Sequence, residues 1–162
     1  MVQIRRICKV VKGGKKLGFR AVVVVGDRAG MVGVGVGKAN EVSSAIRKSV
    51  DDAKKHQIKV SMMGKTIPHD TEGKWDASKV ILRPAPTGTG VIAGGAVRTV
   101  LELAGIADVV AKSIGASNAI NTARATIEGL KSLKTLEAEE DFRGKKLDVK
   151  FVQTALSAGG EG

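Results

Sequence analysis

Residues 9–38 read KVVKGGKKLGFRAVVVVGDRAGMVGVGVGK, three apolar runs separated by turns rich in glycine and lysine. β-Branched residues dominate these runs, and Gly clustered with Lys, Asp or Arg interrupts them, which is typical of strands joined by turns. The pattern predicts strands over residues 2–11, 19–25 and 31–36. It also predicts a charged loop over residues 12–16 and a second turn over residues 26–30.

A basic helix is predicted to follow the third strand, with Asn40 as its candidate cap. Apolar residues recur there at intervals of three and four, which is helical spacing, at Val42, Ala45, Ile46, Val50 and Ala53. The other side of this helix carries four cations: Arg47, Lys48, Lys54 and Lys55. Three strands and one helix are therefore expected to form a first domain over residues 1–65.

The second half alternates strands and helices. Short extended pieces are expected over residues 57–60 and 66–67, and a clear strand over 78–83 stops at Pro84 and Pro86. A glycine-rich turn over residues 88–95 opens a helix that ends at Gly105, and a strand over 106–114 follows. Asn118 or Asn121 then caps a last amphipathic helix. A second α/β domain is expected over residues 66–134, and residues 135–162 are expected to form a charged, solvated tail or a short helix.

Positive charge is concentrated in the first half. Residues 1–70 carry 15 Lys and Arg against 5 Asp and Glu, whereas residues 71–162 carry 12 against 11, so most of the net charge of +11 lies on one side. A basic sheet surface is typical of polyanion binding, and nucleic acid is the default polyanion. A merely solvated basic surface is disfavoured, because surplus charge destabilises a compact fold by self-repulsion. The candidate phosphate-binding cations of this half are Arg5, Arg6, Lys9, Lys12, Lys15, Lys16, Arg20, Arg47, Lys54 and Lys55.

Composition excludes several classes of protein. Aromatic residues make up only 2% of the chain and Tyr is absent, so duplex or folded RNA suits it better than a single strand held by stacking. Cys8 is the only cysteine, which leaves no disulfide framework and no cysteine-based metal site. No apolar run approaches the length of a membrane span, and no signal peptide precedes the first strand. An intracellular or organellar protein without a membrane partner is expected.

The segment GVGVGKA at residues 33–39 is similar to a phosphate-binding loop but fails at two positions. Val32 replaces the first Gly of that pattern, and Ala39 replaces the Ser or Thr whose hydroxyl would hold magnesium. The alternate glycines are expected instead to let a helix or an RNA backbone approach closely.

A better match to a cofactor motif is GTGVIA at residues 88–93, which fits the dinucleotide pattern and has Asp108 about twenty residues further on. Pro84 and Pro86 separate this loop from the strand before it, and too few strands follow for a doubly wound sheet. A phosphate of RNA or a neighbouring protein is favoured as the partner of this helix start. A dinucleotide-dependent enzyme that uses residues 88–93 stays open as the alternative.

No catalytic constellation is apparent. His56 ends the basic helix, where it is expected in solvent, and His69 follows Pro68 in a turn, where an RNA contact or a structural hydrogen bond is favoured over acid–base chemistry. The GxxG segment at 30–33 joins two strands, whereas the RNA-binding module with that motif places it between two helices. The residues therefore predict no enzyme, no cofactor and no metal.

Several segments together resemble the bacterial-type fifth small-subunit ribosomal protein family. They are VKGGKK and FRAVVVVGD, then VGVGVGKANEV and the basic helix, then TIPH at 66–69, RPAPTGTGVIAGGAVRTVLELAGI at 83–106 and SIGASNAINTARATIEGL at 113–130. The resemblance covers about residues 3–133 in order and with matching spacing. The segments FRAVVVVGD and GVIAGGAVRTVLELAG are similar to those of plastid-type members. The plastid stroma is therefore favoured over the bacterial cytoplasm as the location of the protein.

The resemblance implies an α+β fold of two small domains. The first is a βββα domain like those that bind double-stranded RNA, and the second is a βα domain of the type named after this family, with a left-handed crossover. It implies a structural constituent of the small ribosomal subunit that contacts small-subunit ribosomal RNA and the fourth and eighth small-subunit proteins. It also implies a contribution to the tunnel through which mRNA enters and to decoding accuracy.

The resemblance also extends the set of candidate site residues. Added to the RNA-binding cations are Gly13, Gly14, Arg28, Lys38 and His69, with further RNA contacts at Lys112, Asn118, Asn121 and Arg124. The interface with the fourth protein, where accuracy is tuned, is expected at Gly88, Gly90, Gly94 and Arg98. The chain departs from the family pattern before the first strand, where only Met1 and Val2 stand, and beyond Leu136. A free-standing regulator that binds duplex RNA is the remaining alternative.

Overall fold

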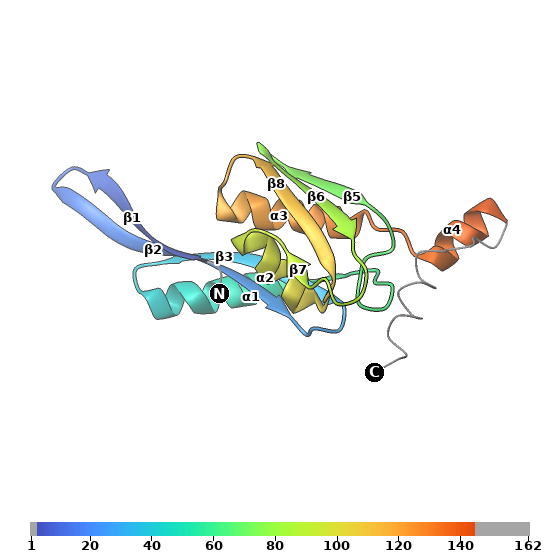
Figure 1. Ribbon diagram of the computed structural model, residues 1–162. Coiled ribbons are helices and arrows are strands. Elements are labelled where there is room, and N and C mark those ends of the chain that lie inside the picture. Colours follow the sequence, from blue (N-terminus) through green and yellow to red (C-terminus); the bar gives the residue numbers. More distant parts are fainter. Residues whose placement is uncertain (1–2, 145–162) are drawn as a thin grey trace.

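Close contact between one helix and a glycine-rich strand organises the N-terminal half. The computed structural model describes residues 3–144, and its first sheet is antiparallel in the order β1-β2-β3-β4. The strands are β1 at Gln3–Val11, β2 at Gly14–Gly26, β3 at Met31–Ala39 and β4 at Ile58–Lys59. Helix α1, Val42–Lys55, covers one face of β2 and β3 (Figure 1).

The alternating sequence of β3 gives its two faces different tasks. Gly33, Gly35 and Gly37 point toward α1, where an added Cβ on any of them would overlap backbone atoms of that helix. Val32 and Val34 point the other way and belong to the apolar core. These glycines were expected to let either a helix or an RNA backbone approach closely, and in the structure helix α1 makes this approach. The segment that is similar to a phosphate loop is therefore an extended strand packed beneath α1.

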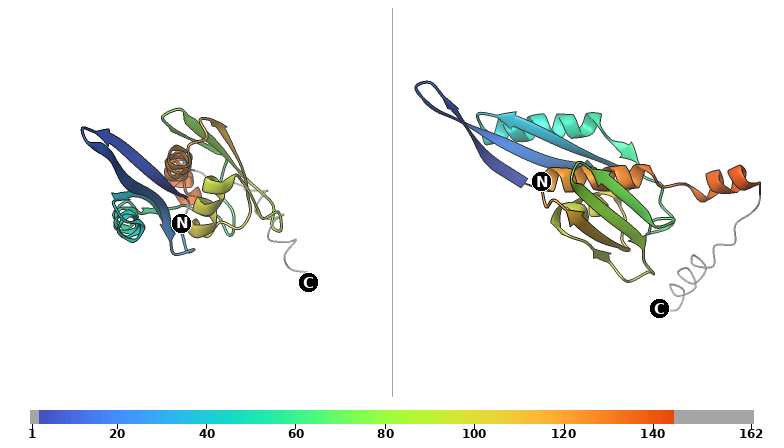
Figure 2. Two further views of the ribbon diagram at one scale, coloured as in Figure 1. Left: turned by 90° about the vertical axis from the view of Figure 1, so that its left-hand side faces the viewer. Right: turned by 90° about the horizontal axis from the view of Figure 1, so that it is seen from above.

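A second sheet of four strands forms the C-terminal half in the order β5-β6-β8-β7. Its strands are β5 at Thr71–Trp75, β6 at Ser78–Pro84, β7 at Val91–Ile92 and β8 at Val109–Gly115, and only the β7–β8 pair is parallel. Helices α2, Gly95–Ala104, and α3, Ala119–Lys131, lie between the two sheets (Figure 2). Helix α4, Leu136–Arg143, projects from the end of this body.

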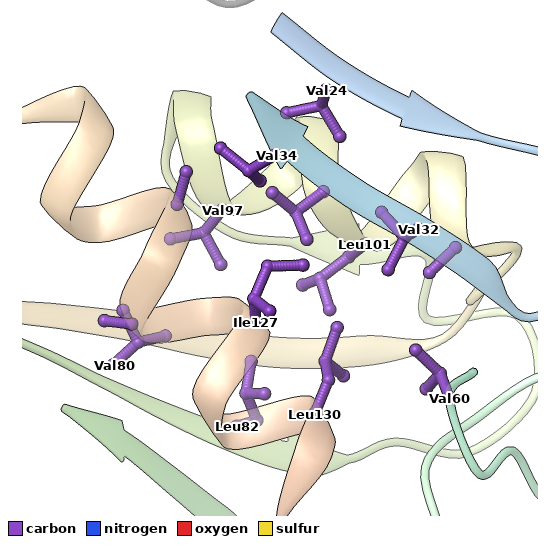
Figure 3. Packing of buried hydrophobic residues seen from close by; sticks show 14 of the residues in the cluster. Val24, Val32, Val34, Val60, Val80, Leu82, Val97, Leu101, Ile127 and Leu130 are labelled. Carbon is purple, nitrogen blue, oxygen red and sulfur yellow. The ribbon is translucent and has the colours of Figure 1, made fainter. Parts of the chain in front are cut away.

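One apolar core joins both halves (Figure 3). The first sheet contributes valines of β2 and β3, α2 contributes Val97 and Leu101, α3 contributes Ile127 and Leu130, and β6 contributes Val80 and Leu82. All these side chains are almost fully removed from water. Because α2 and α3 contact both sheets, the two halves are stabilised by the same buried surface.

The turn between β2 and β3 fastens the first sheet to α2. The amides of Arg28 and Gly30 donate to the carbonyl oxygens of Leu103 and Ala104, each at 2.9 Å. These carbonyls lie at the C-terminal end of the helix, where no intrahelical donor is available. Within the turn, Asp27 Oδ1 accepts from the amides of Ala29 at 2.8 Å and Met31 at 3.0 Å. These bonds to the charged form hold the pKa of Asp27 below its ordinary value.

The predicted α+β class with a βββα first half is confirmed, but several local predictions are wrong. Glu41, not Asn40, stands at the cap of α1, and its side chain makes no cap hydrogen bond. Strand β5 was not predicted, because its sequence TEGKW is mostly polar and its inward position is Gly73, which packs against α3. Of the two residues predicted as the cap of α3, Asn118 has this role: its side chain accepts from Ile120 N at 3.2 Å.

The predicted C-terminal tail contains a short helix in the part that the structure describes. Residues 136–143 of the tail form the short helix α4, and residues 145–162 lie outside the described part of the chain. The limits at residues 65 and 134 stay predictions, since the core crosses the first of them. Within residues 3–144, none of the helices is long and apolar enough to cross a membrane.

The close packing of α1 on β3 gives a stability prediction. Gly35→Ala places a methyl group against the Ser49 carbonyl, so the helix must move away, and the free energy of unfolding should fall by about 2 kcal/mol. Gly95→Ala is the matched control, because a Cβ there meets no atom within 4 Å. Urea denaturation of both variants measures the difference. Equal midpoints for the two would contradict the packing described for β3.

Candidate nucleic-acid interface

The hairpin of β1 and β2 extends beyond the rest of the sheet (Figure 1). Its pairing runs without interruption from Gln3 opposite Val22 to Val11 opposite Gly14. The predicted loop over residues 12–16 is therefore too long, since only Lys12 and Gly13 form the turn. A φ of +100° at Gly13 lets the chain reverse within two residues, so the strands continue almost to the tip.

The register places five cations on one face of this sheet. Lys9 lies opposite Lys16, Arg5 lies opposite Arg20, and Arg20 lies opposite Lys38 on β3. Like charges directly across a ladder destabilise a sheet unless something neutralises them. The opposite face of the hairpin carries Arg6 and Lys15 together with apolar side chains, of which Val10 is 76% exposed.

No carboxylate neutralises these cations in the described part of the chain. Residues 1–26 contain no Asp or Glu. The ion pairs of residues 3–144 involve acidic side chains from Asp52 onward, and none includes a Lys or Arg of the first 55 residues. Arg20 Nε is buried and has no hydrogen-bond partner. The hairpin is therefore an uncompensated positive arm.

Helix α1 adds a second basic surface on the other side of the first sheet. Arg47, Lys54 and Lys55 are exposed, as predicted, and point away from the strands. Lys54 and Lys55 also lie in the last turn, where a cation stabilises the helix dipole without any ligand. Arg28, with a positive φ of 58°, lies in the turn that contacts α2. The structure thus divides the basic set predicted for the first domain between separate surfaces.

The candidates of the second half differ in how they are engaged within the chain. Asn118 caps α3, the Nδ2 of Asn121 donates to Asp76 Oδ2 at 3.1 Å, and Arg124 lies over the ring of Trp75. Lys112 is exposed on β8, on the outer face of the second sheet. Of the four, only Lys112 therefore has no partner among the described residues.

His69 takes part in a structural hydrogen bond, which is one of the two roles expected for it. Its Nε2 accepts from the amide of Lys134 at 3.0 Å, while its Nδ1 lies 2.8 Å from the carbonyl oxygen of Asp70. An accepting Nε2 requires the proton on Nδ1, so the neutral ring bridges the start of β5 and the segment after α3.

The glycine-rich loop before α2 is held by a buried carboxylate. Asp108, only 5% exposed, accepts from the amides of Gly88 at 3.1 Å and Gly90 at 3.0 Å. In a dinucleotide site such amides would face the pyrophosphate and the acidic residue would face a ribose. Here the two groups bond to each other, and β7 is only two residues long. The dinucleotide alternative therefore loses its physical basis.

The surface predicted as a protein interface is open. Gly94 has no atom within 4 Å of an added Cβ and no positive φ, so nothing in the described residues requires glycine there. Arg98 is exposed one turn further along α2, and its Nε donates to Glu102 Oε1 at 2.8 Å. Gly88 and Gly90 have positive φ, so their turn accounts for glycine at both positions.

Two residues near these surfaces were missing from the predicted site. Lys48 is exposed on α1 beside Arg47; the helical pattern already placed it on the basic face of the helix, but it was not included among the candidate RNA contacts. Trp75 is 39% exposed at the end of β5. Because β5 itself was not predicted, no sequence pattern brought Trp75 to Arg124. Within residues 3–144, no group of three His, Cys, Asp or Glu is arranged to hold a metal ion.

Both halves of the chain match known ribosomal protein families. Residues 1–61 match the N-terminal domain of ribosomal protein S5, and residues 73–143 match its C-terminal domain. The small ribosomal subunit protein uS5 of Acaryochloris marina is 54% identical over 155 residues, which cover 95% of this chain and 88% of the relative. The proteins of the same name from Nostoc punctiforme and Thermosynechococcus vestitus are 56% and 59% identical, over 89% and 86% of this chain and 83% and 82% of their own lengths.

The buried carboxylate of the glycine-rich loop gives a prediction. Asp108→Ala removes the acceptor for two backbone amides, and the free energy of unfolding should fall by about 1–3 kcal/mol. Asp108→Asn keeps an acceptor oxygen and should be destabilised less. Thermal or urea unfolding of both variants provides the comparison, and a fully stable Asp108→Ala protein would show that the carboxylate does not hold the loop.

Proposed function

This chain belongs to the ribosomal protein S5 family, and we propose that its basic hairpin holds small-subunit ribosomal RNA. Membership in the family makes it a structural, non-enzymatic protein of the small ribosomal subunit. The observation that carries the proposal is the row of cations on β1, β2 and β3 that no carboxylate of the described residues neutralises. RNA phosphates supply the missing negative charge.

The geometry of the hairpin supports the same proposal. Strand β3 pairs with β2 only from Phe19 onward, so the pairs from Ile7–Gly18 to Val11–Gly14 stand beyond it. Five residue pairs at about 3.4 Å each give a two-stranded arm about 15 Å long. An isolated two-stranded ribbon is marginally stable in water. Phosphates along both faces would remove the repulsion between its lysines and stabilise the arm.

The more detailed roles follow from family resemblance and from the exposed surfaces. We assign the tip around Lys12 to RNA in the subunit, and the protein to the wall of the tunnel through which mRNA enters. The surface of Gly88, Gly90, Gly94 and Arg98 is assigned to the fourth small-subunit protein, at a contact that influences decoding accuracy. The open space beside Gly94 and Gly95 supports this, since it lets another backbone come close. Contact with the eighth protein is assigned to the second half.

The remaining candidate RNA contacts are assigned to the same ribosomal RNA, with Arg47, Lys54 and Lys55 as a second basic surface. We propose domain limits at 1–65 and 66–134, followed by a tail over 135–162. The ribosome is the site of action. Relatives from cyanobacteria fit the plastid stroma that the sequence favoured, with the bacterial cytoplasm as the alternative.

Sedimentation separates this proposal from a free-standing regulator of duplex RNA. A ribosomal constituent should be found in small subunits at one copy each. A pool that remains with free RNA and leaves the subunit unoccupied would favour the regulator.

The RNA-binding proposal predicts a change in salt dependence. Replacing Lys12, Lys15 and Lys16 together by Gln should reduce the slope of log K against log salt by about 0.7–0.9 for each phosphate that is no longer neutralised. Folding should change little, because exposed charges contribute little stability. Binding of small-subunit ribosomal RNA is measured between low and moderate salt. The control triple Lys65→Gln, Lys131→Gln and Lys134→Gln removes the same charge elsewhere, and equal slopes for the two triples would contradict the role of the hairpin.

The accuracy proposal predicts a phenotype for Arg98. Arg98→Leu should leave a folded and assembled subunit but weaken one protein interface by about 1–3 kcal/mol. A looser interface shifts the equilibrium between open and closed subunits, so misreading of near-cognate codons should rise. Stop-codon and missense reporters in cells with this single copy measure the error frequency. Glu102→Gln breaks the intrahelical ion pair but keeps the arginine and should leave accuracy near normal. Unchanged errors in Arg98→Leu with normal subunit profiles would remove Arg98 from the interface.

A further inference from the structure

The only tryptophan of the chain lies at an exposed edge of the second sheet. Trp75 ends β5, and a two-residue turn at 76–77 connects it to β6. This turn lies beside the loop between β8 and the N-terminal end of α3 (Figure 1). An indole in this position lacks much of the burial that normally stabilises tryptophan, because 39% of the residue remains exposed.

Hydrogen bonds hold the surroundings of Trp75 in one arrangement. The amide of Ala116 donates to the carbonyl oxygen of Ala77 at 3.0 Å, and Ser78 Oγ donates to the carbonyl oxygen of Ala116 at 2.7 Å. On the other side of the turn, Asn121 Nδ2 donates to Asp76 Oδ2 at 3.1 Å. A ligand that binds here therefore meets a preformed edge, and little conformational entropy is lost on binding.

An unpaired cation stands next to the ring. The guanidinium carbon of Arg124 lies 5.3 Å from the centroid of Trp75, which is the range of a cation–π contact. Within residues 3–144, Arg124 makes no ion pair and its side chain makes no hydrogen bond. The nearby carboxylate of Asp76 is bonded to Asn121 instead. The guanidinium donors thus remain available to an anion.

We propose that Trp75 and Arg124 form a binding site for one unpaired RNA nucleotide. The exposed part of the indole stacks on the base, and the guanidinium pairs with the phosphate of the same nucleotide. This pairing of an aromatic surface with a planar cation matches the two chemically distinct parts of a nucleotide. The inference rests on the RNA-binding function proposed above and adds a base contact in the second domain. It also refines the expectation of recognition by shape alone, which the low aromatic content had favoured.

Because Trp75 is the only tryptophan of the chain, indole fluorescence reports on this site alone. The full chain is titrated with transcribed small-subunit ribosomal RNA of Nostoc punctiforme, while indole emission and its quenching by acrylamide are followed. Stacking should lower the emission and protect the indole from acrylamide. In a parallel assay with labelled RNA, Trp75→Leu should weaken binding about 5-fold to 100-fold. Trp75→Phe keeps an aromatic surface and should bind close to wild type.

Arg124 separates the base contact from the phosphate contact. Arg124→Gln should reduce the salt slope by about 0.7–0.9, whereas Trp75→Leu should leave the slope unchanged. Unfolding midpoints of all variants are measured alongside, and the indole emission of the wild type and the salt slope of Arg124→Gln give a result even if Trp75→Leu does not fold.

Three results would overturn the site. RNA binding by the wild type with unchanged emission, and unchanged affinity in the Trp75 variants, would remove the site but leave the hairpin proposal intact. No RNA binding by the wild type would refute the hairpin proposal and this site together. Protection of the indole only after other small-subunit proteins are added would identify a protein as the occupant.

Discussion

The apolar layer that α2 and α3 form between the two sheets determines how the rest of this protein is arranged. Leu101 and Leu130 are almost completely buried there, and each such side chain contributes about 1.5–3 kcal/mol when removed from water. Val32 and Val34 approach this layer from the first sheet, and Val80 approaches it from the second. Because one layer serves both sheets, the second half fixes the position of the first. The hydrogen bonds between the β2–β3 turn and the end of α2 add direction to this nonspecific attraction.

The same arrangement explains where the charge is placed. Both faces of β2 and β3 are occupied along most of their length, one by α1 and the other by α2 and α3. The exposed lysines of the hairpin, Lys9, Lys12, Lys15 and Lys16, therefore lie where the sheet has no cover, at the end of the hairpin that precedes Phe19. The basic surface of the hairpin begins where the apolar core ends, so substitutions of its lysines need not disturb the packing of the core. Lys9 and Lys16 lie across from each other at a site where only an external anion can relieve their repulsion.

The features that depend on local alternation could be predicted from the sequence. Valine and glycine alternate along β3, and this pattern predicted both the strand and the close approach of another element. Polar β5 could not be predicted, because the helix that makes Gly73 necessary is some fifty residues away in the chain. The structural role of Asp108 could not be predicted either, because its hydrogen-bond partners lie about twenty residues away in the chain. Its spacing from the glycine-rich loop suited a cofactor motif, and only the fold brings its carboxylate to the amides of Gly88 and Gly90. The distribution of charge located the basic half but not its separation into hairpin and helix surfaces.

The shared core also has a consequence for how the protein is made. A chain leaves the ribosome from its N-terminus, so the first sheet and α1 emerge before α2 and α3 have been synthesised. During that interval, Val22, Val24, Val32 and Val34 form an apolar surface with nothing to cover it. The cationic hairpin emerges at the same time, among the nucleic acids of the translating ribosome. The nascent protein thus exposes an apolar surface and a cationic hairpin at the same time, and the interval in which it can aggregate depends on how soon the residues up to Leu130 follow.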